Sequence, residues 1–174
     1  VKPDIAIITN IGEAHIENFK NQKGIAKAKS EIIENINING SLILNRDDKY
    51  YNYLSRLAKK RKIDVLSFGE STKATARLIK IKSNKTYKNL HFRVKNKNIY
   101  LKIKNVNSLI VLNILFTLLT LEILDLDLKK IKNFTDHFQL IEGRGKTHNI
   151  LRYKKKFQLI DESYNANPSS VKNA

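Results

Sequence analysis

The chain has 174 residues, no cysteine, and 33 Lys and Arg against 16 Asp and Glu, which gives a net charge of +17. This length suffices for one domain with its own core, or for one domain and part of another. The absence of cysteine excludes a disulfide framework, and the chain opens without a signal-peptide pattern, so we expect a cytoplasmic protein.

The positive charge by itself favours nucleic acid or an anionic membrane as a partner. The excess is mostly lysine, with 26 Lys against 7 Arg, as an A/T-rich genome would produce. The basic residues are scattered, with short clusters only at 59–62 and 154–156, and no aromatic-and-basic stacking motif accompanies them. We therefore expect no nucleic-acid partner and keep a basic nucleic-acid-binding module as the alternative from another class.

The first part of the sequence predicts a parallel sheet. Residues 4–9 are apolar after Asp4 and read as a buried strand, followed by a helix over 22–36. Buried strands follow at 41–45 and 64–69, on either side of a helix over 46–62. Strands and helices that alternate at this spacing are typical of a doubly wound, mostly parallel α/β sheet.

The pattern changes after residue 70. Segments 74–82, 89–94 and 98–104 alternate apolar and polar residues, which predicts an antiparallel meander with one solvated face. Two helices are expected at about 107–124 and 127–137. The apolar stretch 109–124 is shorter than a membrane span and carries Asn113 and Glu122, so we expect a core helix and no membrane insertion.

Glycines at 143 and 145 interrupt the chain and indicate a domain boundary, with domains over 1–143 and 144–174. A buried strand ending at Asp161 then leads into a new helix, for which Asn167 is a suitable cap and Pro168 a suitable first residue. Capping leaves Tyr164 and Asn165, in the same turn, without a structural explanation.

Two residues near the first strand can carry chemistry. His15 follows the strand between Glu13 and Glu17, and α/β sheets place ligands beyond the carboxyl ends of their strands. Lys29 falls on the apolar stripe that Ile25 and Ile32 define, where it either snorkels to solvent or points into a site. A loop histidine is most often only a surface residue, and Glu13 and Glu17 are by default solvated charges. Metal coordination and phosphate chemistry are the functional alternatives.

Four stretches together resemble the Mur ligases of peptidoglycan synthesis: "TNIGEAHIENF", "AKAKSEI", "EGR" and "DESYNANPSSV". The resemblance covers the whole chain, as the second half of the central ATP-binding domain and the start of a Rossmann-like C-terminal domain. Within the family the similarity is greatest to members that add D-alanyl-D-alanine to a UDP-N-acetylmuramoyl-peptide. Another amide ligase of the same superfamily, with a different amine, is the nearest alternative.

The resemblance implies a reaction and a set of roles. Family members use ATP and Mg²⁺ to phosphorylate a peptide carboxylate, and an amine attacks the acyl phosphate. The position of His15 is a magnesium ligand, and that of Lys29 is a carbamylated lysine that also serves the metal. Asn10 lines the nucleotide and substrate cleft, and Arg144 reaches the ATP phosphates. The nucleotide-facing turn corresponds to Asp161, Tyr164 and Asn165.

The sequence departs from the family at the entry to the long helix. Where the family has "G-x-H-N-x-x-N", this chain has "NSLIVLN", which keeps Asn113 and carries Leu109 and Ile110 in place of His and Asn. The family's phosphate-binding loop and uridine-nucleotide domain correspond to sequence before Val1. We therefore expect an internal fragment of a monomeric ligase that does not turn over ATP by itself.

Overall fold

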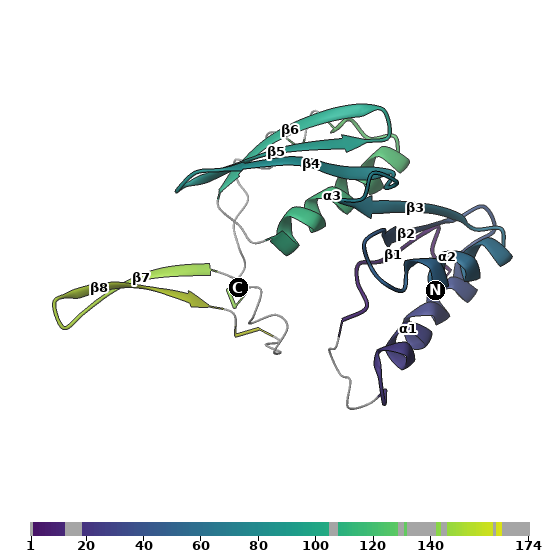
Figure 1. Ribbon diagram of the computed structural model, residues 1–174, viewed down its shortest axis with the longest axis horizontal. Helices are drawn as coiled ribbons and strands as arrows, with labels where there is room; N and C mark the ends of the chain where they lie inside the picture. The colour runs from purple at the N-terminus through teal and green to yellow at the C-terminus, as the bar shows by residue number, and fades with distance from the viewer. Residues whose placement is uncertain are drawn as a thin grey trace.

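A six-stranded mixed sheet forms the main body of the structure, which is a computed structural model (Figure 1). It describes residues 2–12, 19–104, 108–128, 131, 142–143, 146–161 and 163–164. The strands follow one another in chain order, β1-β2-β3-β4-β5-β6, and a separate antiparallel pair is formed by β7 and β8. This arrangement confirms the predicted mixture of a parallel sheet and an antiparallel meander.

The parallel part is built from β1 (Ile5–Ile8), β2 (Ser41–Asn45), β3 (Asp64–Gly69) and the start of β4 (Ala76–Ser83). α1 (Gln22–Ser30) connects β1 to β2, and α2 (Tyr51–Lys60) connects β2 to β3. The side chain of Asn21 caps α1 by accepting from the Gly24 amide at 3.0 Å. Both helices pack on the same face of β1–β3, where they bury Ile25, Leu54 and Ala58.

The predicted helix over 22–36 has two parts. α1 ends at Ser30, and the chain continues as a short 3-10 helix, η2 (Glu31–Asn35). A 3-10 turn has 3.0 residues rather than 3.6, so side chains after Ser30 rotate away from the stripe that an unbroken helix would present. Ile33 remains buried, whereas Ile32 is 38% exposed.

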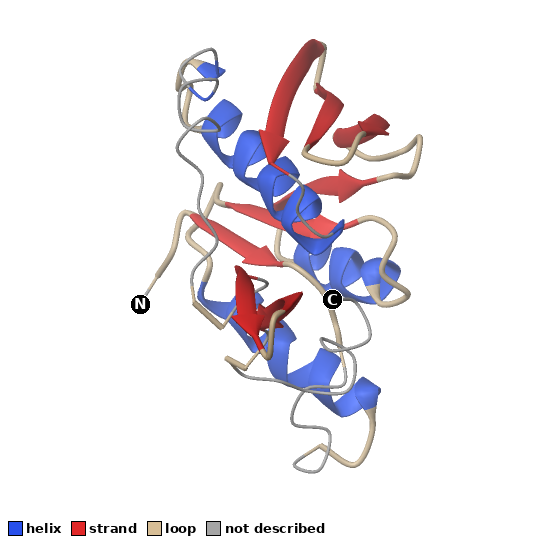
Figure 2. Cartoon of the chain, turned by 90° about the vertical axis from the view of Figure 1, so that its left-hand side faces the viewer, coloured by secondary structure: helices blue, strands red, loops and turns tan. Residues whose placement is uncertain are grey.

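The antiparallel part consists of β4, β5 (Tyr87–Val94) and β6 (Lys97–Lys104). α3 (Ser108–Ile123) lies against the inner face of the sheet and buries Val111, Leu115, Leu118 and Leu119 with residues of β3–β6. Figure 2 shows this helix crossing the strands diagonally. Of the helices that the structure describes, none is long and apolar enough to cross a bilayer.

The end of the chain differs from the sequence-based prediction. β7 (Lys146–Arg152) and β8 (Lys155–Asp161) form a hairpin whose turn places Tyr153 and Lys154 at φ of 52° and 60°. Positive φ at both central residues is typical of the tight turn that joins antiparallel strands. The prediction that the strand ending at Asp161 is buried is wrong, because residues 155–160 are exposed in the part of the chain that the structure describes.

The remaining predicted elements fall largely outside the described residues. These are most of the helix over 127–137 and the helix after Pro168. The division into domains at 143/144 stays a prediction.

Candidate active site

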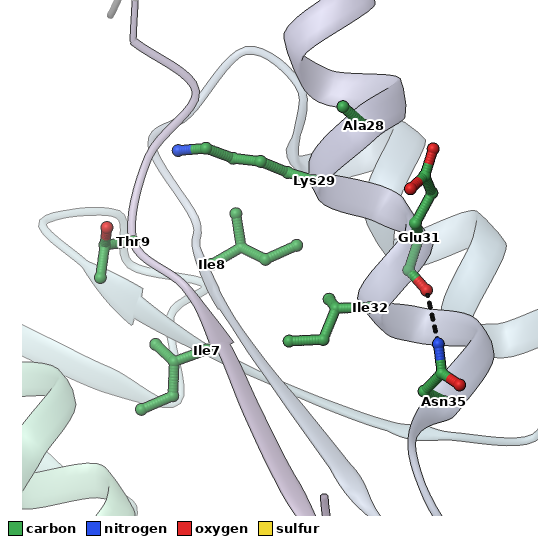
Figure 3. A pocket seen from close by; sticks show the side chains of 8 residues that line it. All are labelled: Ile7, Ile8, Thr9, Ala28, Lys29, Glu31, Ile32 and Asn35. Carbon is green, nitrogen blue, oxygen red and sulfur yellow. Dashed lines mark hydrogen bonds between the residues drawn. The ribbon is translucent and has the colours of Figure 1, made fainter. Parts of the chain in front are cut away.

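Lys29 lies beside the end of β1, as the sequence predicts, and makes a specific contact there. Its Nζ donates to the backbone carbonyl oxygen of Asn10 at 2.9 Å. Asn10 is two residues beyond Ile8, the last residue of β1. Figure 3 shows the lysine side chain extending from α1 toward the segment that follows β1. Two of the predicted site residues are therefore neighbours at the carboxyl end of a parallel strand.

Lys29 is not buried in the structure. The residue is exposed, although its sequence position suggests an apolar stripe. The snorkelling alternative describes it better, because the stem leaves the helix and the amine reaches a polar partner. The cost of a buried ammonium therefore gives no reason to modify this residue.

An open cavity of about 520 Å³ lies between β1 and the α1–η2 segment. Ile7, Ile8 and Thr9 line one side, and Lys29 and Ile32 contribute to the other (Figure 3). The cavity adjoins both the amine of Lys29 and the strand end. A ligand that enters it would meet isoleucine side chains, the amine of Lys29, and the polar side chains of Thr9, Glu31 and Asn35.

Asp48 holds the same peptide group from its opposite side. The carboxylate oxygen Oδ2 accepts from the Ile11 amide at 2.7 Å, and Oδ1 accepts from the Tyr50 amide at 2.8 Å. The carbonyl of Asn10 and the amide of Ile11 belong to one peptide unit. Lys29 thus binds its oxygen while Asp48 binds its N–H, and this single peptide is fixed between α1 and the turn after β2.

Asp47, the neighbour of Asp48, binds the loop after β3 in the same way. Its carboxylate accepts from the amides of Glu70 at 2.6 Å and Ser71 at 3.1 Å, in the loop after β3. Gly69, at φ 150°, permits this approach, since a Cβ there would come within 2.2 Å of Asp47 Oδ2. The loops after β1 and β3 are thereby both attached to the turn between them.

Sequence reasoning missed this pair of aspartates because it placed them inside the helix over 46–62. α2 begins only at Tyr51. The available signal was the order of residues in "NRDD": Asn45 accepts from the Asp47 amide at 2.9 Å, which is a turn typical of Asn. Two carboxylates after a buried strand, next to such a turn, indicate side chains that accept hydrogen bonds from nearby backbone amides.

A second group of predicted residues lies at the end of β8. Asp161 accepts from the Gly143 amide at 3.0 Å and from the amide and hydroxyl of Ser163 at 3.1 and 2.6 Å. The Ser163 hydroxyl, followed by the Ser163 and Gly143 amides, holds the pKa of this carboxyl below its usual range. Asp161 therefore organises the turn as a carboxylate.

Tyr164 and Gly143 meet across the same turn. The Tyr164 amide donates to the Gly143 carbonyl at 3.0 Å. Gly143 adopts φ 75°, and a Cβ there would lie 2.8 Å from the Cβ of Tyr164. The tyrosine side chain is 59% exposed. The turn that Asp161 organises therefore also holds Tyr164, since both residues bond to Gly143.

The other candidates are apart from these groups or outside the described residues. Asn113 is exposed on α3, and its carbonyl accepts from the Thr117 hydroxyl at 2.8 Å. The predicted site residues outside the described ranges are His15, Arg144 and Asn165, together with Glu13 and Glu17. In the part of the chain that the structure describes, no group of three His, Cys, Asp or Glu could hold a metal ion.

Comparisons with known proteins converge on one family. The sequence profile of the Mur ligase middle domain matches residues 1–121. The chain is 35% identical, over 175 aligned residues, to the UDP-N-acetylmuramoyl-tripeptide–D-alanyl-D-alanine ligase of Rickettsia prowazekii (strain Madrid E). This alignment covers all of the chain and 38% of the relative.

Solved structures give the same result for the fold. A MurF structure from Acinetobacter baumannii matches 99% of the chain and 36% of its own length, with a TM-score of 0.85 at 26% identity. MurF from Thermotoga maritima in complex with ADP matches 98% of the chain and 38% of its own length, with a TM-score of 0.80 at 23% identity. The chain thus spans a little over a third of each of these proteins.

Replacing Asp48 should loosen the peptide between Asn10 and Ile11. In Asp48→Asn the charged acceptor of two amides becomes a neutral amide group, so we expect the free energy of unfolding to fall by about 1–2 kcal/mol. Hydrogen exchange at the Ile11 amide should accelerate more than at the Glu70 amide. Exchange followed by NMR measures both amides in one sample.

Asp47→Asn is the matched control, since Asp47 binds the other loop with the same chemistry. It should accelerate exchange at Glu70 and Ser71 and leave Ile11 protected. If the two variants gave the same exchange pattern, the two loops would be held by something other than these carboxylates.

The hydrogen bonds of the turn at Asp161 should persist to a pH below the ordinary aspartate pKa. Because the folded pKa is depressed, the stabilisation from this carboxylate is complete above the pKa of the unfolded chain and is lost as the pH falls through the folded value. We expect the amide chemical shifts of Gly143 and Ser163 to stay constant down to the ordinary aspartate range and to change only below it. Asp161→Asn should abolish this titration, and a midpoint above the ordinary range would contradict the assignment.

Proposed function

The chain belongs to the Mur ligase family, and we propose that it forms part of an ATP-dependent ligase that adds D-alanyl-D-alanine to a UDP-N-acetylmuramoyl-tripeptide in peptidoglycan synthesis. The observation that carries this proposal is the match of the entire chain to a ligase with that specificity. The contact between Lys29 and the end of β1 supports it, because it places an amine where parallel sheets bind their ligands. The ligase works in the cytoplasm as a monomer.

Lys29 and Asn10 form the part of the proposed site that lies at the carboxyl end of β1. Transfer of a phosphoryl group to the peptide carboxylate spreads negative charge over phosphoryl oxygens, which a cationic environment stabilises. The ammonium of Lys29 is exposed and stands at the open cavity beside β1. Once the ammonium has lost one proton, the neutral amine can add dissolved carbon dioxide and release a second proton, which leaves a carbamate on the nitrogen.

The donor set at this edge suits magnesium only in the modified form. Magnesium takes oxygen ligands, and an ammonium is not a ligand. A carbamate on Lys29 would add carboxylate oxygens near the carbonyl oxygen of Asn10, and His15 would be the remaining protein ligand. Bound magnesium would neutralise phosphate charge in the reaction.

The other candidate residues serve the nucleotide. Arg144 provides a planar, permanently charged fork for the ATP phosphates. Asp161 shapes a turn that presents the exposed ring of Tyr164, and both residues would meet the nucleotide after domain closure. The remaining nucleotide-binding residues in this proposal are Asn10, Asn113 and Asn165.

The full-length protein tests the function directly. Purified enzyme with ATP, Mg²⁺, the tripeptide nucleotide and D-alanyl-D-alanine should release phosphate in step with formation of the pentapeptide product, measured by mass spectrometry. L-alanine and D-glutamate, offered as alternative amines, should give no product. Turnover of either in preference to D-alanyl-D-alanine would assign the chain to a different ligase.

Lys29 should be required as a carbamate. Lys29→Ala in the full-length ligase should lower kcat by roughly a thousandfold or more, since the site loses its carboxylate. The melting temperature should fall only slightly, because one hydrogen bond, to the Asn10 carbonyl, is lost. Lys29→Arg should be equally inactive although it keeps the charge. Added acetate or propionate should restore part of the activity of the alanine variant.

Lys27→Ala, an exposed lysine on the same helix, is the control and should retain full activity. A carbamate signal should appear in ¹³C NMR of wild-type protein supplied with ¹³C-bicarbonate and be absent from Lys29→Arg. An active arginine variant, or wild-type protein without that signal, would show that Lys29 acts as a cation.

A further inference from the structure

The charge of the chain is not distributed evenly. Residues 71–121 contain eleven of the 33 Lys and Arg and none of the 16 Asp and Glu. All eleven lie between Lys73 and Lys104, on β4, β5, β6 and their connecting loops. The three-stranded antiparallel part of the sheet is therefore strongly cationic, while the remainder of the chain carries both signs.

Strand pairing brings six of these eleven cations to one face. In antiparallel strands, directly paired residues point to the same side of the sheet. Lys80 pairs with His91, which pairs with Tyr100. The other rows on this side are Lys82–Asn89–Lys102, Arg77–Arg93–Asn98 and Tyr87–Lys104. We call the eleven residues of these four rows, six of which are Lys or Arg, the cationic face.

The cationic face is the solvated side of this part of the sheet. The alternate residues, such as Leu90, Phe92 and Leu101, point to the other side and pack with α3. Lys80, Lys82, Lys102 and Lys104 are all exposed, and Tyr100 is 61% exposed. In Figure 1 α3 lies under β4–β6, so the cationic face is the surface turned away from that helix.

Within the described ranges, no acidic side chain forms an ion pair with a cation of this face. The ion pair that the structure describes in this region, Lys97 with Glu122 at 2.8 Å, links β6 to α3 and lies off the cationic face. Like charges at this density repel one another, so the face is most stable against a surface of opposite sign. An anionic partner has the matching charge.

The three aromatic rings and the two arginines of the face each make a contact within the protein. The ring of His91 stacks on Tyr100 with centroids 4.4 Å apart, and the ammonium of Lys102 lies 4.5 Å from the ring centroid of Tyr87. The guanidinium groups of Arg77 and Arg93 donate to the backbone carbonyls of Glu70 and Lys95. What remains directed outward is mainly lysine.

We propose that the cationic face docks the protein peripherally on an anionic lipid surface. The lysine ammonium groups of the face, on β4 and β6, act as point charges and suit a diffuse negative surface potential. A single nucleic-acid strand would instead favour rings open for base stacking and arginines free to bind phosphate. This docking is independent of the ligase chemistry proposed above.

Vesicle co-sedimentation tests the docking. The 174-residue chain and the full-length ligase should both sediment with vesicles of phosphatidylglycerol and phosphatidylcholine in equal parts, and not with phosphatidylcholine alone. Binding should weaken with added salt. Lys80→Gln, Lys82→Gln, Lys102→Gln and Lys104→Gln combined should reduce the partition coefficient by roughly 600-fold, at about fivefold per lysine.

A control variant removes the same net charge elsewhere, by changing Lys2, Lys23, Lys59 and Lys60 to Gln; these four residues are exposed and lie off the cationic face. Both variants should keep the wild-type melting temperature, and the control should keep most of the binding. Equal loss in the two variants would show that net charge alone acts, and would overturn the proposal. So would full-length protein that fails to sediment, or tighter binding of the chain to a single-stranded oligonucleotide than to the vesicles.

Discussion

The peptide unit between Asn10 and Ile11 is the point at which three elements of the structure meet. Lys29 of α1 binds its oxygen, and Asp48 of the turn after β2 binds its N–H. A peptide that is fixed from both sides cannot rotate about its flanking bonds without breaking one of these contacts. The direction in which the chain leaves β1, toward the segment that contains His15, is therefore set by residues distant in the sequence.

The same turn explains how the carboxyl edge of a parallel sheet stays organised. Loops that follow parallel strands meet at one edge, and each has backbone amides that need acceptors. Asp48 serves the loop after β1 and Asp47 the loop after β3, so two adjacent carboxylates satisfy amides on both sides of β2. Charge-assisted hydrogen bonds are stronger than neutral ones, which suits loops that must hold a defined shape.

How much the sequence reveals depends on whether the signal is local. The strands at 41–45 and 64–69 follow from short apolar runs, and their bounds agree with the structure. Lys29 is exposed because the buried side of α1 is formed by Ile25, Ala26 and Ser30, and a polar serine gives no sign of this in the apolar pattern. The roles of Asp47 and Asp48 depend on amides in two other loops. Such contacts are defined only once the strands have been placed side by side.

The cationic face is a second feature that local sequence patterns do not reveal. A search for basic runs along the chain finds only short clusters, because in β4–β6 the outward lysines alternate with core residues. Lys80, Lys82 and Lys102 gather only when register places them in neighbouring rows. Alternation serves two purposes here, since the residues between them bury the side chains that hold α3 to the sheet. The core of this region therefore fixes the positions of its surface charges, and a change of register by one residue would lose both.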